Sequence, residues 1–331
     1  MRVLVTGGAG YIGSHTAKAL AAAGHRPVSL DNLERGHRWA VRWGPLIEAD
    51  LADRAALVRT LAEHRIEAVI HFAAYAYVGE SMARPERYFR NNAVGTLNLL
   101  DAIREHGVRQ IVFSSSCATY GDPATVPMTE ELPQAPVNPY GESKLIAERM
   151  IRWYARAHGL AAASLRYFNA AGADPDGELG ERHEPETHLI PLAIGAALGR
   201  GPGLEIYGTD YATADGTAVR DYVHVSDLAD AHVRALERPG PAGEMRVYNL
   251  GAGEGTSVRE VVAAVERVGG RTVPRVEVGR RMGDPPVLLA AIDKAKRELE
   301  WEPRRSGLEF IVETAWRWHE AGWSDSQNRS H

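Results

Sequence analysis

Tyr140 and Lys144 stand four residues apart in the run YGESK, and their types could support proton transfer. On a helix this spacing places both side chains on one face, so the ammonium can lie near the phenol. A free phenol has a pKa near ~10 and is a poor base at neutral pH. One positive charge at ~4 Å, with an effective dielectric of ~20, contributes about 4 kcal/mol, or roughly three pK units. Lys144 could therefore help to make Tyr140 a usable base; a surface Tyr/Lys pair is the alternative.

Ser116 adds a hydroxyl to this candidate catalytic set. It ends the run IVFSSS, whose apolar residues predict a buried strand. Ligands collect at the carboxyl edge of a parallel sheet, so we expect Ser116 at the same site as Tyr140 and Lys144.

The segment VLVTGGAGYIGSH near the start predicts a phosphate-binding turn. Gly8, Gly10 and Gly13 form G-x-G-x-x-G, and Gly7 extends the pattern, between an apolar strand and a helix-forming run. Glycines let the backbone approach a pyrophosphate closely, and the helix N-terminus offers free N–H groups with a partial positive charge. A tight strand–helix turn without a ligand is the alternative.

Asp31 ends the next predicted strand and indicates which dinucleotide would bind. Its carboxylate would accept hydrogen bonds from ribose hydroxyls and repel a 2′-phosphate, which favours NAD over NADP. Arg35 is near enough in sequence to keep NADP as an alternative.

The elements that must position these residues alternate along the first half of the chain. Apolar runs predict strands at 3–5, 28–30, 46–49, 68–72, 110–114 and 162–167. Amphipathic stretches predict helices at roughly 12–23, 53–64, 85–106 and 140–158. This alternation indicates an α/β fold, with a doubly wound parallel sheet covered on both faces. Beyond about residue 170 the pattern becomes irregular, and two later strand-like runs, 221–225 and 247–250, are expected to return to the first domain.

Composition bounds the class of protein. The chain has 331 residues, enough for two domains, and its net charge of −5 argues against a general nucleic-acid binder. Cys117 is the sole cysteine, so an intrachain disulfide is impossible and a reducing cytoplasm fits. No apolar run approaches the ~18 residues of a membrane span, and no cleavable leader is recognised. We expect a soluble cytoplasmic protein that binds neither nucleic acid nor membranes.

These motifs together resemble the extended short-chain dehydrogenase/reductase superfamily. Within it, the runs GTDYATADGT at 208–217 and RDYVHVSDL at 220–228 closely resemble UDP-glucose 4-epimerases. The shorter motifs that share this resemblance are DNL at 31–33, HFAA at 71–74, VGES at 78–81, NN at 91–92, RYFN at 166–169 and RRMGD at 280–284. The resemblance extends over nearly the whole chain, to about Trp301.

The resemblance implies an enzyme that holds NAD tightly and interconverts UDP-galactose and UDP-glucose through a transient 4-keto sugar. Tyr140 would take the proton of the sugar 4-hydroxyl while C4 passes hydride to NAD. Ser116 would hydrogen-bond the 4-oxygen. Lys144 would bind the nicotinamide ribose and lower the pKa of Tyr140.

The same motif match implies two sets of binding residues. The cofactor would be lined by Gly7, Gly10, Tyr11, Ile12, Gly13, Asp31, Asn32, Asp50, Leu51, Phe72, Ala73, Asn92, Ser116, Tyr140, Lys144 and Phe168. The UDP-sugar would be held by Ser116, Asn169, His188, Leu189, Tyr207, Arg220, Arg281 and Asp284. Two guanidinium groups suit a dianionic diphosphate, and a carboxylate suits a ribose diol. No metal site is predicted.

The resemblance also implies an architecture and an assembly. Residues 1–170 would form a Rossmann-type NAD-binding domain, with returning segments near 221–250. Residues 171–331 would form a smaller mixed α/β domain for the nucleotide sugar. Members of the family are commonly homodimers that pair the helices near 85–106 and 140–158.

Three positions depart from the family or vary within it. Ala76 falls where some members carry a lysine near the cofactor phosphates, so one electrostatic anchor is missing. His188 replaces an asparagine; it could bind substrate phosphate or serve a structural role. Leu288 aligns with a site beside the sugar and could admit an N-acetyl group, so epimerisation of UDP-N-acetylhexosamines stays open.

Residues just before Tyr120 disfavour the related chemistries of this superfamily. Nucleotide-sugar dehydratases carry an Asp-Glu pair where this chain has Cys117 and Ala118, and decarboxylating relatives also need that glutamate. The 3,5-epimerases use a cysteine two residues before the tyrosine, whereas Cys117 lies three before it; we interpret Cys117 as a small buried side chain. A non-catalytic NAD-binding scaffold is the alternative from another class. Such a protein would be expected to lose Tyr140, Lys144 or the arginines.

Overall fold

The computed structural model describes residues 1–281 and 283–322. Its larger part is a parallel sheet of seven strands in the order β10-β6-β5-β4-β1-β2-β3. The strands are β1 (Arg2–Thr6), β2 (Arg26–Asp31), β3 (Leu46–Glu48), β4 (Ala68–His71), β5 (Gln110–Ser116), β6 (Ala161–Tyr167) and β10 (Met245–Leu250). The order reverses direction between β1 and β4, and such a switch point is where open α/β sheets bind ligands. The predicted Rossmann-type α/β fold is confirmed.

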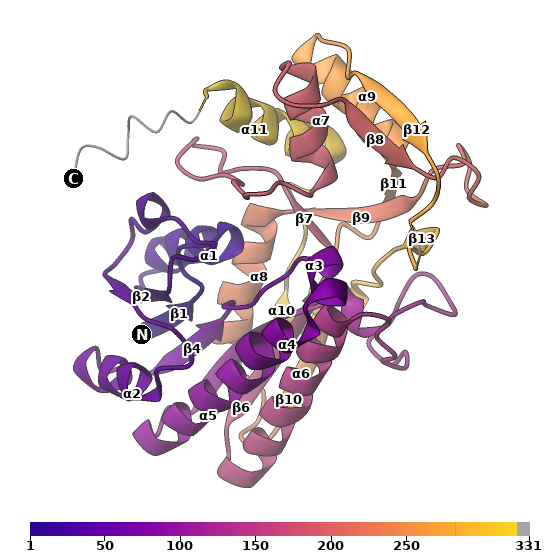
Figure 1. The fold of residues 1–331 in the computed structure, drawn as a ribbon. Coiled ribbons are helices and arrows are strands. Elements are labelled where there is room, and N and C mark those ends of the chain that lie inside the picture. The colour runs from indigo at the N-terminus through magenta and orange to yellow at the C-terminus, as the bar shows by residue number, and fades with distance from the viewer. Residues whose placement is uncertain (282, 323–331) are drawn as a thin grey trace.

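Helices cover both faces of this sheet (Figure 1). One face carries α1 (Tyr11–Ala22) and α8 (Val225–Glu237), and the other carries α2 (Arg54–Glu63), α5 (Gly95–His106) and α6 (Pro139–His158). Neighbouring residues of β1 enter opposite cores, because side chains alternate along a strand: Val3 packs on the α1/α8 side and Leu4 on the other.

The predicted helix at 85–106 is helical in three consecutive pieces. They are α4 (Pro85–Tyr88), a π-helical turn (Phe89–Val94) and α5, and they follow the short helix α3 (Val78–Ala83). Asn138 is the N-cap of α6: its side chain accepts a hydrogen bond from the N–H of Gly141 at 2.8 Å, and Pro139 is the first residue of the helix. It ends at Gly159, which adopts the left-handed conformation with φ of 66°.

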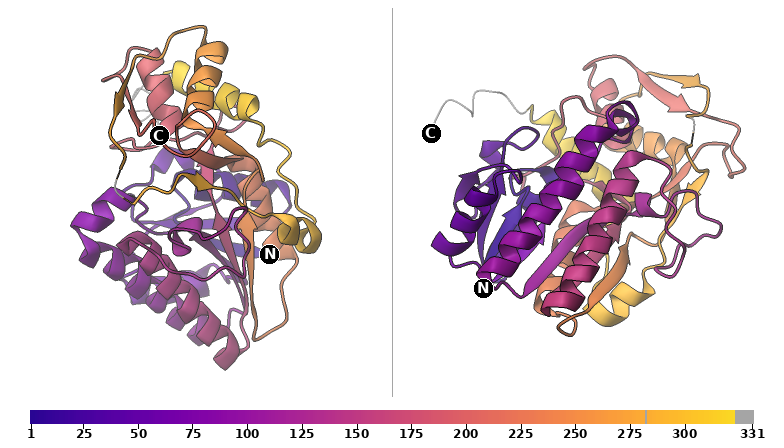
Figure 2. Two further views of the ribbon diagram at one scale, coloured as in Figure 1. Left: turned by 90° about the vertical axis from the view of Figure 1, so that its right-hand side faces the viewer. Right: turned by 60° about the horizontal axis from the view of Figure 1, so that its bottom comes forward.

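A smaller region packs above the carboxyl ends of the main sheet (Figures 1 and 2). Its strands are β7 (Asn169–Ala171), β8 (Leu204–Tyr207), β9 (Val219–His224), β11 (Gly255–Ser257), β12 (Arg275–Val278) and β13 (Val287–Leu288). Its helices are α7 (Leu189–Ala197), α9 (Val258–Gly269) and α11 (Leu308–Glu320), which share one apolar core. Helix α10 (Asp293–Leu299) packs against β10, and two single 3₁₀ turns occupy Arg38–Ala40 and Cys117–Thr119.

The two late strand-like runs, 221–225 and 247–250, join different sheets. The run at 247–250 belongs to β10, which pairs in parallel with β6 at the edge of the main sheet. The expectation for 221–225 is wrong, because β9 pairs with β7, β11 and β13 in the smaller sheet. A short apolar run does not encode which partner a strand takes, and only the following helix α8 returns to the main sheet.

In the described ranges of the chain, no helix is both long and apolar enough to cross a membrane. The functional division at residue 170 stays a prediction.

Candidate active site

One large cleft lies between the carboxyl ends of the main sheet and the smaller region. Its volume of about 1920 Å³ exceeds the ~300–1,000 Å³ of a pocket for one small ligand, so it has room for two. Of the predicted cofactor residues, all but Asn92 and Lys144 line it; those two side chains are buried just beneath its wall. Every predicted substrate residue lines it too, as do Ala76 and Leu288.

The glycine turn joins β1 to α1 at one end of this cleft. Gly7 has a φ of 72°, and a Cβ on it would lie 2.7 Å from the backbone nitrogen of Ala73. A Cβ on Gly13 would lie 2.2 Å from the carbonyl oxygen of Gly7. Gly10 is the N-cap of α1, without a side-chain cap, so the first N–H groups of the helix are available to an anion. This backbone cradle fits the pyrophosphate of a dinucleotide.

Asp31 stands at the end of β2, where the sequence places the ribose acceptor. Its carboxylate accepts hydrogen bonds from the N–H groups of Ala9 at 3.0 Å and Leu33 at 2.9 Å. Burial nevertheless raises its pKa above the ordinary value. Arg35, the residue that left NADP open, donates instead to the carbonyl oxygen of Glu184 at 2.7 Å and stacks over the ring of Tyr77.

Ser116 and Tyr140 meet at the centre of the cleft. Ser116 ends β5, and its Oγ accepts a hydrogen bond from the N–H of Ala118 at 3.1 Å. Tyr140 lies in the first turn of α6 and is almost fully buried. Burial raises the pKa of Tyr140 well above the value of a free phenol, and its hydrogen bond with Ser116 opposes that rise.

Lys144 is buried on α6 beside strand β5. Its Nζ donates to the carbonyl oxygen of Ser114 at 2.8 Å and lies 5.0 Å from the centre of the Phe113 ring. Burial lowers its pKa to about 7, although the charge of Glu148 opposes this. The expectation that Lys144 lowers the pKa of Tyr140 stays a prediction.

Of the predicted diphosphate ligands, Arg220 lies on β9 of the smaller sheet and Arg281 lies between β12 and β13. Arg220 on β9 forms an ion pair with Asp284, and Leu288 on β13 is its direct strand partner. The guanidinium of Arg281 lies over the ring of Tyr207, 3.8 Å from its centre. Both arginines line the cleft.

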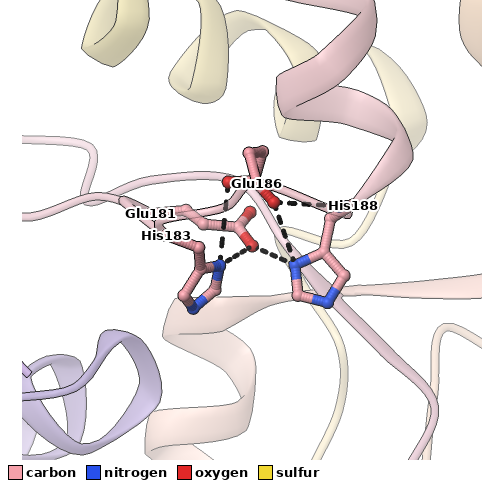
Figure 3. A group of neighbouring side chains, drawn as sticks. All are labelled: Glu181, His183, Glu186 and His188. Atoms are coloured by element: carbon pink, nitrogen blue, oxygen red, sulfur yellow. Dashed lines mark hydrogen bonds and ion pairs between the residues drawn. The ribbon is translucent and has the colours of Figure 1, made fainter. Parts of the chain in front are cut away.

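His188 belongs to a cluster that sequence reasoning missed (Figure 3). Its Nδ1 hydrogen-bonds the buried carboxylate of Glu181, and Nδ1 of His183 lies 3.1 Å from the same oxygen. Glu186 approaches both imidazoles. Burial lowers the pKa of His183, but the two glutamates outweigh it and raise that pKa to about 10. The signal was present in the run ERHEPETH, where glutamate and histidine alternate at short spacing.

A second missed feature is the buried ion pair of Glu148 and Arg166 beneath the catalytic residues. Their side chains are 1% and 2% exposed, and Arg166 Nη2 lies 2.6 Å from Glu148 Oε2. Glu148 follows Lys144 by four residues on α6, a spacing that could have identified it. Cys117, expected to be buried, is only partly buried and lines the cleft; the loss of solvation there raises the pKa of its thiol to about 12.

The fold and the glycine turn define an α/β protein built to hold a dinucleotide. Residues 3–251 match the NAD dependent epimerase/dehydratase family, and the chain belongs to that family.

Individual relatives match almost end to end. A UDP-glucose 4-epimerase of Rhizobium leguminosarum bv. trifolii is 52% identical over 317 residues, which are 96% of this chain and 97% of that protein. The crystal structure of UDP-glucose 4-epimerase from Brucella ovis in complex with NAD has 54% identity and a TM-score of 0.92, covering 96% of this chain and 97% of that one. The structure of the Bifidobacterium longum UDP-glucose 4-epimerase with NAD+ and UDP has 38% identity and a TM-score of 0.93, covering 97% and 99%.

Proposed function

We propose that this chain is an NAD-dependent UDP-hexose 4-epimerase that interconverts UDP-galactose and UDP-glucose. One observation carries the proposal: a single cleft holds the glycine turn, the Ser116–Tyr140 pair and the two arginines. The relatives named UDP-glucose 4-epimerase support the same reaction, as do the NAD and UDP found in their structures.

The reaction needs a hydride acceptor that also returns the hydride, and bound NAD supplies this chemistry at C4 of the sugar. Tyr140 takes the proton of the 4-hydroxyl as the C4–H bond breaks and the C4=O bond forms. Ser116 holds the 4-oxygen by a hydrogen bond. After the 4-keto sugar presents its other face, Tyr140 returns the proton to the oxygen, so the residue acts first as base and then as acid.

The buried position of Tyr140 requires help from positive charge. A phenol whose pKa is raised by burial is a poor base. Lys144, one helical turn further along α6, is held by Ser114 and can turn its ammonium toward a nicotinamide ribose and the phenol. Closure of the site over both ligands would then bring the pKa of Tyr140 toward its working range.

The UDP moiety would be gripped from the smaller region. Arg220 and Arg281 present guanidinium groups to the diphosphate, and Asp284 is placed beside Arg220 to accept from a ribose hydroxyl. Asn169, His188, Leu189 and Tyr207 complete this wall of the cleft.

Leu288 favours a second candidate substrate. It lines the cleft and pairs with Arg220, so its side chain borders the space for the sugar. A leucine there leaves more room than a tyrosine would, and UDP-N-acetylhexosamines are the alternative substrates.

The assembly and location follow from the same proposal. The chain would work as a cytoplasmic homodimer, with residues 1–170 as the NAD-binding domain, which β10 and α8 complete. Support for the dimer comes from the outer faces of α5 and α6, where Leu97 and Trp153 are exposed.

The proposal is tested by incubating the purified protein with UDP-galactose and, separately, with UDP-N-acetylgalactosamine. We expect the 4-epimer of UDP-galactose. Product from UDP-N-acetylgalactosamine alone would identify the chain instead as a UDP-N-acetylhexosamine 4-epimerase. Absence of 4-epimer in both reactions would contradict the proposal.

Tyr140→Phe should lower kcat by about 10²–10⁴-fold and leave the melting temperature almost unchanged, because only the proton carrier is lost. Tyr248→Phe is the matched control, since that buried phenol bonds Glu298 outside the cleft. A Tyr140→Phe enzyme that stays active would remove Tyr140 as the base.

A further inference from the structure

We propose that Glu181, His183, Glu186 and His188 form a binding site for a divalent first-row transition metal such as zinc. Each of the four side chains offers one ligand atom, and these atoms all lie within 4.8 Å of one another. Two imidazole nitrogens and two carboxylate oxygens suit zinc and its neighbours, whereas calcium and magnesium prefer oxygen alone.

Three nitrogen–oxygen distances within the cluster, which involve both carboxylate oxygens of Glu186, are near the separation of neighbouring ligands around a tetrahedral ion. Bonds of ~2.1 Å in a tetrahedron separate neighbouring ligand atoms by about 3.4 Å. Nδ1 of His183 lies 3.1 Å from Glu181 Oε1 and 3.7 Å from Glu186 Oε2. Nδ1 of His188 lies 3.6 Å from Glu186 Oε1. The contact between Glu181 and His188 is a direct hydrogen bond that the ion would replace, with release of its proton.

The ligand atoms converge on one point although they come from a loop (Figure 3). Both imidazoles turn Nδ1 toward Glu181, and the other ring nitrogen of His188 points away from the cluster. Nδ1 of His183 is buried and makes no hydrogen bond of good geometry within the described structure. This nitrogen faces two carboxylates at ion-pair distance, a position in which a metal ion could replace its proton.

Supporting hydrogen bonds hold the carboxylates in place. Glu186 Oε1 accepts from the N–H groups of Thr187 at 2.7 Å and His188 at 2.9 Å. The backbone oxygen of Glu181 accepts from the indole of Trp318 on α11 at 3.0 Å. Such outer contacts orient the ligands of metal sites. His188 is 53% exposed, which gives an ion a path into the cluster.

Charge and the neighbouring acidic group support the assignment. As metal ligands the two imidazoles would be deprotonated, and with two carboxylates they would carry a charge of −2, which one divalent ion neutralises in place of the imidazole protons. On the same loop, Asp174, Asp176 and Glu178 form a similar group, but Nζ of Lys18 lies 2.8 Å from all three and already supplies their cation. The two groups therefore provide a test site and a matched control.

The test uses the full chain after treatment with EDTA. The protein is incubated with ZnCl₂ or MgCl₂ and desalted, and bound metal is measured by mass spectrometry; no substrate is present, so the result does not depend on epimerase activity. We expect one zinc per wild-type chain, no magnesium, and a melting temperature that rises with zinc concentration. Glu178→Gln should behave as wild type.

His183→Gln should lose the retained zinc and the zinc-dependent rise in melting temperature. Circular dichroism verifies its fold, and His188→Asn, at the exposed edge of the cluster, is the second variant if the first fails to fold. Wild-type protein that retains no zinc, or folded variants that retain as much as wild type, would overturn the proposal.

Discussion

The buried carboxylate of Glu148, beneath the catalytic residues, contributes to the stability of the fold. Its carboxylate accepts hydrogen bonds from Arg166 Nε at 2.9 Å, Ser115 Oγ at 2.6 Å and Ser164 Oγ at 2.8 Å. Glu148→Gln would leave the guanidinium of Arg166 buried without its counter-ion. We expect the free energy of unfolding at pH 7 to fall by about 3–5 kcal/mol, measured by urea denaturation.

The same pair predicts a pH dependence. Burial alone would raise the pKa of Glu148, but the hydrogen bond and charge of Arg166 outweigh it and hold that pKa below its ordinary value. An acid with a lower pKa in the folded state stabilises the fold above its unfolded pKa, near ~4.3, and this stabilisation is lost as pH falls through the folded pKa. The difference in unfolding free energy between wild type and Glu148→Gln should therefore have its largest value at pH 7 and become smaller below about pH 4.

Glu63→Gln, an exposed position on α2, is the control and should differ little from wild type at either pH. An equally large difference for Glu148→Gln at pH 7 and pH 3 would show that its charge is not responsible.

At the scale of elements, the turn from β1 into α1 determines dinucleotide binding. A Cβ on Gly13 would strike the backbone of Gly7, which cannot retreat without opening the turn. Gly13→Ala is expected to lower stability by about 1–3 kcal/mol and to remove NAD that copurifies with wild type, measured after denaturation by an enzymatic NAD assay. In Gly279→Ala the new Cβ meets no atom within 4 Å, so NAD content should persist. Full NAD content in Gly13→Ala would contradict this role.

Elements were predictable where the signal is local. The six predicted strands and four helices of the first half all occur, because apolar runs and helical periodicity depend on neighbours in sequence. The partner of β9 was not predictable, since strand pairing depends on distant segments. For the same reason Arg220, Asp284 and Leu288 entered the site only through the family resemblance: β9 and β13 bring them together across more than sixty residues.

The features of the site that the sequence did not predict depend on how side chains pack in the folded protein. Nothing local in the sequence shows that Lys144 bonds the carbonyl oxygen of Ser114, or that burial raises the pKa of Tyr140. The Glu181–His188 cluster was visible as spacing, but its convergence depends on a loop conformation that the spacing does not specify.

At the scale of the whole molecule, the exposed apolar side chains on α5 and α6 predict the interface of the proposed homodimer. These helices lie side by side on the outer surface (Figure 2), where Trp153 is 67% exposed and Leu97 is 37% exposed. Trp153→Glu should convert a dimer into a monomer, because it places an unpaired charge in an apolar contact. Size-exclusion chromatography with light scattering gives the mass directly.

Val276→Glu is the matched control for that variant. Val276 is 56% exposed on β12, in the smaller region, and its replacement should leave the dimer intact. A monomeric wild-type protein, or a dimeric Trp153→Glu, would contradict the assignment of the interface.

The central claim is that hydride leaves C4 of the sugar and returns to the same carbon within one cleft. The most direct measurement follows UDP-[4-²H]galactose with the purified protein and no added NAD, by mass spectrometry and NMR of the product. We predict UDP-glucose that retains deuterium at C4, because the hydride never exchanges with water. Absence of conversion, or product in which deuterium has been replaced by solvent hydrogen, would contradict the account.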